Sequence, residues 1–165
     1  MKEHDELADL IKQPSVEVEE QEEAVSPRTQ ARRVALQALY QWQVNSSEIY
    51  LIEKQFLEQG LLSGLDRDWF RELLSEVSRS ADELDQQYAD FLDRSIKLIN
   101  PVERTILRMA AYELQTQMQI PYKVVINEAV ELTKRFGAED AHKYINGVLD
   151  KVAQRLRPLE IGVKA

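Results

Sequence analysis

The sequence predicts an all-α protein of about seven helices in two packed helical sub-bundles, and three observations support this. Apolar residues recur at helical spacing along every long segment. No segment alternates apolar and polar residues as a half-buried strand does. Only 5 Gly and 5 Pro occur among 165 residues, which leaves little material for a turn-rich β architecture. The 44% hydrophobic content is ample for the core of a domain of this length.

The first predicted helix spans residues 27–44. Ser26 suits the N-cap, and Pro27 suits the first helical position, where its missing N–H would have no intrahelical partner. The expected buried stripe comprises Ala31, Ala35, Ala38, Leu39 and Trp42. The opposite side carries Arg28, Arg32, Arg33, Gln37, Tyr40 and Gln41.

Two further helices are expected before residue 100. A helix over 49–59 buries Phe56, and a loop at 60–64 follows it. The next helix starts at Asp66, and its apolar register continues to Leu92 with a kink near 78–81. The buried residues of this register are Trp69, Phe70, Leu73, Leu74, Val77, Leu84, Tyr88, Phe91 and Leu92.

A helix over 101–118 opens with a clear start signal. Asn100 can cap it, Pro101 takes the first position, and Glu103 can reach back as in a capping box. The apolar stripe repeats every four residues through Val102, Ile106, Ala110 and Leu114.

Residues 121–150 predict two helices joined by a tight corner. Pro121 suits the first helical position, and Gly137 can adopt the left-handed conformation that stops a helix. Glu139 and Asp140 then place negative charge on the first turn of the next helix, where the helix dipole favours it. The buried face of the first of these helices comprises Val125, Ala129, Leu132 and Phe136.

The same corner places an acid, a base and an aromatic ring together. In the simplest interpretation, Asp140 stabilises its helix N-terminus, while Lys143 and Tyr144 face solvent. Asn127 lies mid-helix, and a hydrogen bond to a neighbouring helix would explain it. Gly147 also lies within a helix, and close approach of another helix would explain its presence.

Charge is distributed unevenly along the chain. Residues 1–25 hold two lysines and nine acidic residues, a net charge of −7, whereas the other 140 residues hold 19 basic and 20 acidic ones, a net charge of −1. We expect 1–25 to be a disordered, solvated tail, with transient covering of the following basic helix as the alternative. A helical domain over 26–158 and a C-terminal tail over 159–165 complete the expected organisation.

Composition argues against enzyme chemistry and metal binding. The absence of cysteine excludes disulfides, thiol catalysis and Cys-based metal sites. No P-loop or GxGxxG motif occurs, and the two histidines, His4 and His142, form no metal-binding pattern. No apolar run suits a signal peptide or a membrane span, so a cytoplasmic location is expected.

The first helix suggests contact with single-stranded nucleic acid. Arg28 and Arg32 lie four residues apart and share a face, Arg33 lies beside them, and Tyr40 follows at about the angle of Arg33. Guanidinium groups contact phosphates and an aromatic ring stacks on a base. The alternatives are a solvated face for the arginines and a place at the rim of the core for Tyr40.

Three segments together resemble the NusB family of bacterial transcription antitermination factors. They are ALQALYQW at 35–42, VERTILR at 102–108 with YEL at 112–114, and residues 121–150, within which INEAVELTKRFG and NGVLD occur in order. The resemblance runs from about Pro27 to Pro158, and the acidic extension lies outside it.

This resemblance implies an all-helical fold of two small bundles and no cofactor. It implies a partner, the ribosomal protein NusE, and binding of the pair to the single-stranded boxA element of ribosomal RNA leaders. The complex would then join RNA polymerase with other Nus factors and suppress premature termination.

The resemblance also implies functional residues. The family's basic helix falls on Arg28, Arg32 and Arg33, with Thr29 and Gln30 between them where other members often carry arginine. The other implied RNA-binding residues are Tyr40, Phe91, Asp140, Lys143 and Tyr144, and the implied partner-binding residues are Glu103 and Tyr40. Phe91 stands where a tyrosine is common, so it could stack but not donate a hydrogen bond.

Two other functions fit the same sequence. One is an RNA-binding module like the NusB-like domain of some ribosomal RNA cytosine methyltransferases, although this chain has no Cys nucleophile. The other is a structural helical adaptor, in monomeric or dimeric form, without RNA contact.

Overall fold

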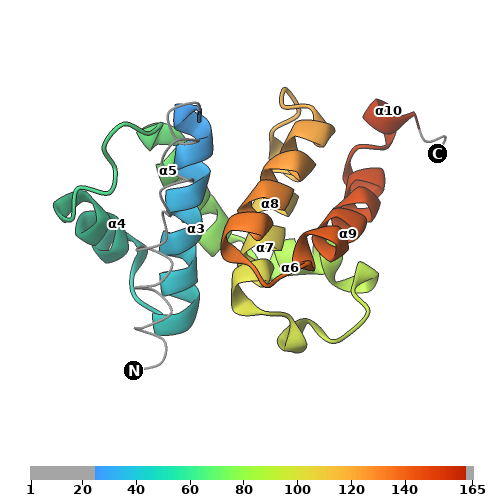
Figure 1. Ribbon diagram of the computed structural model, residues 1–165, viewed down its shortest axis with the longest axis horizontal. Coiled ribbons are helices and arrows are strands. Elements are labelled where there is room, and N and C mark those ends of the chain that lie inside the picture. The colour runs from blue at the N-terminus through green and yellow to red at the C-terminus, as the bar shows by residue number, and fades with distance from the viewer. Residues whose placement is uncertain (1–24, 163–165) are drawn as a thin grey trace. The chain divides into compact units, whose positions relative to one another are not determined.

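The computed structural model describes residues 25–162, and these residues form helices and connecting loops without any strand (Figure 1). The all-α prediction is confirmed, with eight α-helices in the described part of the chain. The chain divides into two compact units, the first ending at Ser78 and the second beginning at Arg79. The expected acidic tail falls on residues outside the described range, apart from Val25.

The first unit is built around α3 (Pro27–Asn45). The Ser26 hydroxyl accepts a hydrogen bond from the Thr29 N–H at 3.1 Å, so the predicted N-cap is confirmed. Both α4 (Ile49–Glu58) and α5 (Arg67–Glu72) pack on α3. Their core residues are Ala31, Ala35, Leu36, Ala38, Leu39, Ile52, Phe56, Trp69 and Phe70.

The helix that starts after Asp66 is not regular. A π-helical turn, η1 (Leu73–Val77), follows α5 and keeps Leu73, Leu74 and Val77 buried against the first unit's core. The Ser78 hydroxyl donates to the Leu74 carbonyl at 2.6 Å, and the helix breaks at Ser80. The kink predicted near 78–81 is therefore confirmed.

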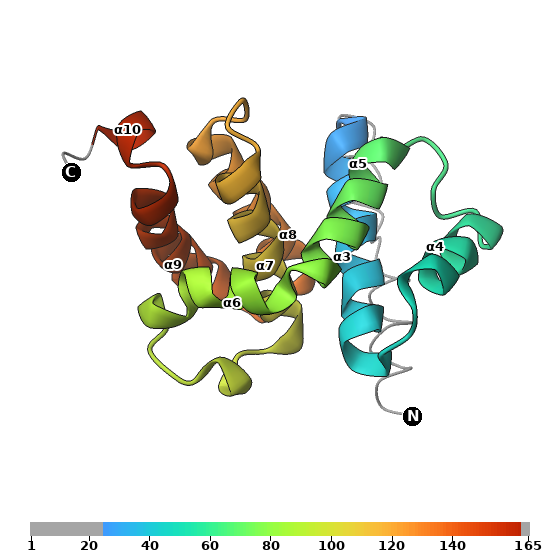
Figure 2. The ribbon, with the colours of Figure 1, turned by 180° about the vertical axis from the view of Figure 1, so that it is seen from behind.

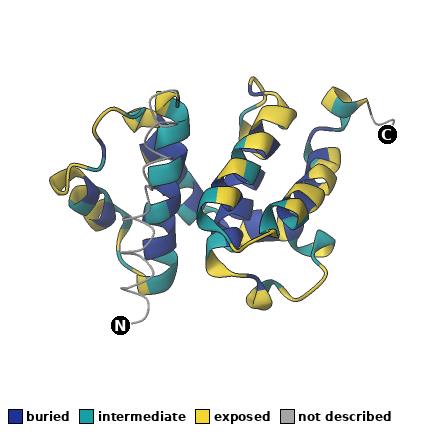
Figure 3. Cartoon of the chain, viewed as in Figure 1, coloured by how far each residue is buried: buried dark blue, intermediate teal, exposed yellow. Residues whose placement is uncertain are grey.

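The second unit has α7 (Pro101–Thr116) at its centre, where α6 (Ala81–Tyr88), α8 (Tyr122–Phe136) and α9 (Ala141–Leu156) pack against it (Figure 2). Nearly the whole length of α7 is buried, and its neighbours turn their exposed faces outward (Figure 3). Short 3-10 turns, η2 (Ala89–Phe91) and η3 (Ile96–Leu98), lie between α6 and α7.

Of the two contacts expected at the start of α7, the structure contains one. Asn100 caps α7 through the Val102 N–H at 2.8 Å, as predicted. The Glu103 carboxylate does not form a capping box; it accepts a hydrogen bond from the Ala138 N–H at 3.2 Å. Glu103 therefore joins α7 to the α8–α9 corner.

The corner itself also corrects the sequence prediction. Gly137 has φ −86° and ψ −178°, which is extended rather than left-handed. A Cβ at Gly137 would lie 2.8 Å from the Thr133 carbonyl oxygen, so close packing requires glycine there. The left-handed residue is Asp140, with φ 63°, and the described first turn of α9 contains no acidic residue.

Arg157 joins the end of α9 to the end of α7. Its guanidinium is buried and donates five hydrogen bonds, to the carbonyls of Leu114, Ile120, Glu113 and Gln117 and to the Glu160 carboxylate. Glu160 also accepts from the Tyr122 N–H at 2.7 Å. Glu160 belongs to α10 (Pro158–Ile161), so the described part of the expected 159–165 tail is a packed helix.

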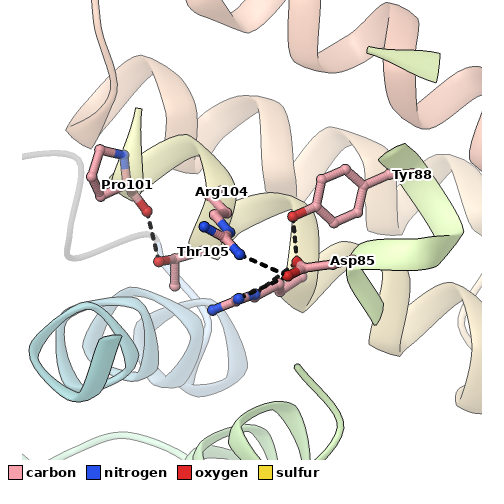
Figure 4. A network of polar contacts seen from close by, with 6 residues as sticks. Asp85, Tyr88, Pro101, Arg104 and Thr105 are labelled. Carbon is pink, nitrogen blue, oxygen red and sulfur yellow. Dashed lines mark hydrogen bonds and ion pairs between the residues drawn. The ribbon is translucent and has the colours of Figure 1, made fainter. Parts of the chain in front are cut away.

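A buried polar network joins α6 to α7 (Figure 4). The Asp85 carboxylate accepts hydrogen bonds from the Tyr88 hydroxyl, from Arg104 at 3.0 Å and from Arg108 at 2.8 Å. Burial alone would raise the pKa of Asp85, but the hydrogen bonds from Arg108, Tyr88 and Arg104 hold that pKa below its ordinary value. Burial and the bond to Asp85 raise the pKa of Tyr88, which therefore stays a neutral donor.

Candidate functional site

The second unit contains a pocket of about 540 Å³ between the loop that precedes α7 and the α8–α9 corner. We call it the corner pocket, and its lining includes Arg94, Leu98, Glu103, Glu139, Asp140 and Tyr144. Three of the residues proposed from the sequence, Glu103, Asp140 and Tyr144, therefore line one cavity.

Tyr144 is held in a fixed orientation at this pocket. Its hydroxyl accepts a hydrogen bond from the Asp93 N–H and donates one to the Asp93 carboxylate, both at 3.0 Å. Arg94 binds the same carboxylate through two nitrogens, at 2.7 and 3.2 Å, and its guanidinium lies 5.5 Å from the Tyr144 ring centroid. The hydrogen bonds from Arg94 and then Tyr144 lower the pKa of Asp93. The result is a half-buried aromatic ring beside an exposed cation.

The acids of the pocket differ in accessibility. Glu139 and Asp140 are exposed, whereas Glu103 is 8% exposed and is bonded to the corner backbone. Glu103 thus contributes to the pocket wall and presents little open surface of its own.

Phe91, the second expected aromatic of this unit, is half-buried beside Arg155. The Arg155 guanidinium lies 4.4 Å from the Phe91 ring centroid. Arg155 also pairs with Asp90 at 2.9 Å and donates to the Gln87 carbonyl at 3.1 Å. One face of the Phe91 ring is therefore occupied by a cation that the chain itself supplies.

Lys143 does not line the corner pocket, although it precedes Tyr144 in sequence. It is exposed and lines a separate groove of about 390 Å³ between α8 and α9. We call this the hairpin groove; its lining includes Lys123, Ile126, Asn127, Lys143, Asn146 and Asp150.

In the first unit, the basic residues of α3 are less exposed than the sequence predicted. The guanidinium groups of Arg28 and Arg32 lie 4.2 and 5.7 Å from the Trp69 ring centroid, an arrangement that stabilises both cations. Arg32 is 4% exposed and Tyr40 2% exposed, so the prediction that they lie on an open face of the helix was wrong. Gln41 is also buried and is hydrogen-bonded to Gln55 at 2.9 Å.

Two expectations for α8 and α9 were also wrong. Asn127 is exposed, so it does not form the buried amide contact that we expected. Gly147 is exposed as well, and no atom of the described residues outside its own helix lies within 4 Å of the position of a Cβ. Close helix packing within the chain does not explain this glycine.

Sequence reasoning missed the roles of four arginines and one aspartate. Arg104 and Arg108 lie one helical turn apart on a largely apolar helix, which could have indicated a buried acidic partner. Nothing local in the sequence identifies Asp85 as that partner, or the positions of Arg94 and Arg157.

The described residues contain no group of three or more acidic or histidine side chains that could hold a metal ion. Over the same range, none of the helices combines the length and the apolar character needed to span a membrane.

Comparison with known proteins gives consistent matches. The model of the NusB family matches residues 29–154. A protein of Hydrogenovibrio crunogenus named transcription antitermination protein NusB is 58% identical over 154 residues, covering 93% of this chain and 96% of that protein. A protein of the same name from Pasteurella multocida is 48% identical over 132 residues, covering 80% and 92%.

Solved structures show the same fold. NusB of T. maritima superposes with a TM-score of 0.71 at 27% identity, covering 83% of this chain and 98% of that one. A chain in a structure described as a plectonemic RNA supercoil superposes with a TM-score of 0.72 at 26% identity, covering 79% and 96%.

Proposed function

Because the chain belongs to the NusB family, we propose that it acts as a transcription antitermination factor. In this proposal it binds, together with the ribosomal protein NusE, the single-stranded boxA element of nascent ribosomal RNA. The assembly then joins RNA polymerase with other Nus factors and helps it read through terminators. The observation that carries the proposal is 58% identity, over 93% of this chain, to a protein named for that function.

The corner pocket supports an RNA contact. Tyr144 offers a ring on which a base can stack, and the neighbouring Arg94 is an exposed cation for a phosphate. The hydrogen bonds to Asp93 fix both side chains before RNA arrives, which reduces the entropy lost on binding. We assign Phe91, Asp140 and Lys143 to the same RNA-binding surface of the second unit.

In the first unit we assign phosphate contacts to Arg28 and Arg33. Arg32 is almost fully buried against Trp69, so we expect it to support this surface rather than to contact a phosphate. Contact with Trp69 also orients Arg28. We assign Tyr40 to both the RNA and the NusE surface, and Glu103 to the NusE surface. Because both are almost fully buried, we expect each to act by shaping the surface of its own unit.

The charge of the chain supports a requirement for the partner. A helical body with net charge −1 binds RNA weakly, and its affinity depends only shallowly on salt. A basic partner would supply the missing charge, so we expect specific binding only when NusE is present. Equal affinity of the isolated chain and of the pair for boxA RNA at the same salt would refute this requirement.

Crosslinking to boxA RNA in the presence of NusE tests the corner pocket. We expect Tyr144→Ala to lose most of the crosslink and Tyr144→Phe to keep it, because only the first removes the ring. Both variants lose the hydrogen bonds to Asp93, so the pair isolates stacking from local structure. Equal crosslinking of both variants and the wild type would remove Tyr144 from the RNA surface.

The arginines of the first unit have a separate test. Arg28→Ala combined with Arg32→Ala should reduce NusE-dependent crosslinking, whereas Lys54→Ala, an exposed cation on α4, should not. Unchanged crosslinking, with NusE still co-purifying, would favour a structural adaptor that does not touch RNA.

A further inference from the structure

Two poor helix formers, Asn127 and Asn146, line the hairpin groove, and a third, Gly147, directly follows Asn146. Asn127 lies within α8, and Asn146 and Gly147 lie within α9; all three are exposed. Asparagine and glycine both destabilise helix interiors relative to alanine. Neither carboxamide makes a side-chain hydrogen bond to another described residue. Contacts within the described chain therefore do not account for these residues.

The open side of Gly147 is equally unexplained by the fold. No described atom outside its own helix would meet a Cβ at this position. A glycine here leaves the backbone of α9 accessible, so another molecule can approach that backbone more closely than it could at a residue with a side chain. The groove beside it is bordered by amide groups that can each donate and accept hydrogen bonds.

The charges of the groove favour an anionic occupant. Lys123 and Lys143 are exposed at its border, and Asp150 is the one acid in the described lining. Ile126 forms part of an apolar floor. A basic border with amide groups and an apolar floor suits the sugar–phosphate backbone of a single strand.

The groove adjoins the RNA surface proposed above at the start of α9. The first turns of α9 place Ala141 and Tyr144 in the corner pocket, and Lys143 and Asn146 in the hairpin groove. A strand that leaves the Tyr144 ring can therefore cross the start of α9 and enter the groove.

We propose that the hairpin groove binds nucleotides that flank boxA, with Asn127 and Asn146 contacting the sugar–phosphate backbone and Lys123 contacting a phosphate. This inference rests on the proposed RNA-binding function and extends it. The groove adds affinity for longer RNA, whereas the corner pocket serves the element itself.

The test compares two fluorescent RNAs by anisotropy, using the full chain with NusE. One RNA is boxA alone, and the other is boxA extended by several nucleotides at each end. The wild type should bind the extended RNA more tightly. Asn127→Ala combined with Asn146→Ala should weaken binding of the extended RNA by about tenfold, the value of one or two net hydrogen bonds. Binding of the RNA that contains only boxA should not change.

A matched pair of lysine variants tests the contribution of charge to binding. For binding of the extended RNA, the slope of log affinity against log salt should become shallower by about 0.7 in Lys123→Ala. This is the value for one phosphate contact on a single strand, about 0.7. Lys151→Ala removes a cation from an exposed position of α9 outside the groove, so it should leave the slope unchanged. Thermal melting checks the fold of all variants, and alanine at exposed helical positions should preserve it.

Three outcomes would overturn the inference. If the wild type binds both RNAs equally, the groove does not contact flanking nucleotides, although boxA binding itself stands. If the groove variants weaken NusE binding but keep the preference for the extended RNA, the groove is a protein interface. If the wild type with NusE binds neither RNA, the proposed function fails, and this extension fails with it.

Discussion

Arg157→Ala is expected to be among the most destabilising single substitutions in the second unit. Arg157 is 3% exposed, and four of its five hydrogen bonds reach carbonyl groups where α7 ends and the following loop turns; the fifth reaches the Glu160 carboxylate. The Glu113 and Gln117 carbonyls also accept from the backbone N–H groups of Gln117 and Ile120. The carbonyls of Leu114 and Ile120, at and beyond the helix end, therefore depend most on the guanidinium. Hydrogen bonds to a charged group contribute about 1.5 to 3 kcal/mol each, but water that enters the truncated site offsets part of the loss. We therefore expect the free energy of unfolding to fall by about 3 to 4 kcal/mol.

Arg155→Ala is the matched control. Arg155 lies two residues earlier on α9 and also binds a carboxylate and backbone carbonyls, but its side chain is 35% exposed. Solvent screens such contacts, so this substitution should cost about 1 kcal/mol or less. Arg157→Lys keeps the charge with fewer donors and should fall between the two.

Urea unfolding followed by two probes measures these differences. The protein has two tryptophans, Trp42 and Trp69, and both lie in the first unit, so their fluorescence reports on that unit. Far-ultraviolet circular dichroism reports on the helices of both units, and coincident transitions would justify a two-state treatment. A loss for Arg157→Ala no larger than that for Arg155→Ala, at unchanged m-value, would refute the assigned role of the guanidinium.

Three further predictions concern stability. Gly137→Ala should destabilise the fold by about 1 to 3 kcal/mol, because its Cβ would overlap Thr133, and urea unfolding tests this directly. Gly147→Ala should stabilise it by about 0.5 to 1 kcal/mol in the same assay, since its exposed helical site has room for a methyl group. Asp85→Asn should cost about 3 kcal/mol at neutral pH, because it leaves two arginines without their carboxylate. The pKa of Asp85 is lowered in the folded state, so its contribution to stability is present above about pH 4 and lost as pH falls through the folded pKa. The difference in unfolding free energy between wild type and Asp85→Asn should therefore shrink as pH falls. A difference that stays constant from about pH 7 to about pH 3 would contradict this.

Local signals in the sequence predicted most of the fold. Ser26 and Asn100 cap the helices that they were expected to cap, because both contacts join residues two or three positions apart. The predictions for Glu103 and Gly137 were wrong because their partners are set by packing. Glu103 binds the backbone of Ala138, 35 positions away, and Gly137 is required by the approach of Thr133 rather than by a left-handed backbone.

The candidate site was predictable only in part. Family resemblance indicated Asp140, Lys143 and Tyr144 as neighbours, but successive residues of a helix point about 100° apart. Lys143 and Tyr144 therefore border different cavities, the hairpin groove and the corner pocket. Arg94 escaped notice because its relation to Tyr144 depends on contact between segments 51 positions apart, those of Asp93 and Tyr144.

Much of the positive charge of this chain is used to stabilise its own fold. Arg104 and Arg108 neutralise Asp85, and Arg157 binds carbonyl groups. Arg155 covers Phe91, while Arg28 and Arg32 lie against Trp69. A guanidinium that is buried or already hydrogen-bonded contributes less to a phosphate contact than a free one, because the existing interaction must be replaced or shared. The count of basic residues therefore overstates the charge that the isolated chain can offer to RNA, which gives the proposed dependence on a basic partner a structural as well as an electrostatic basis.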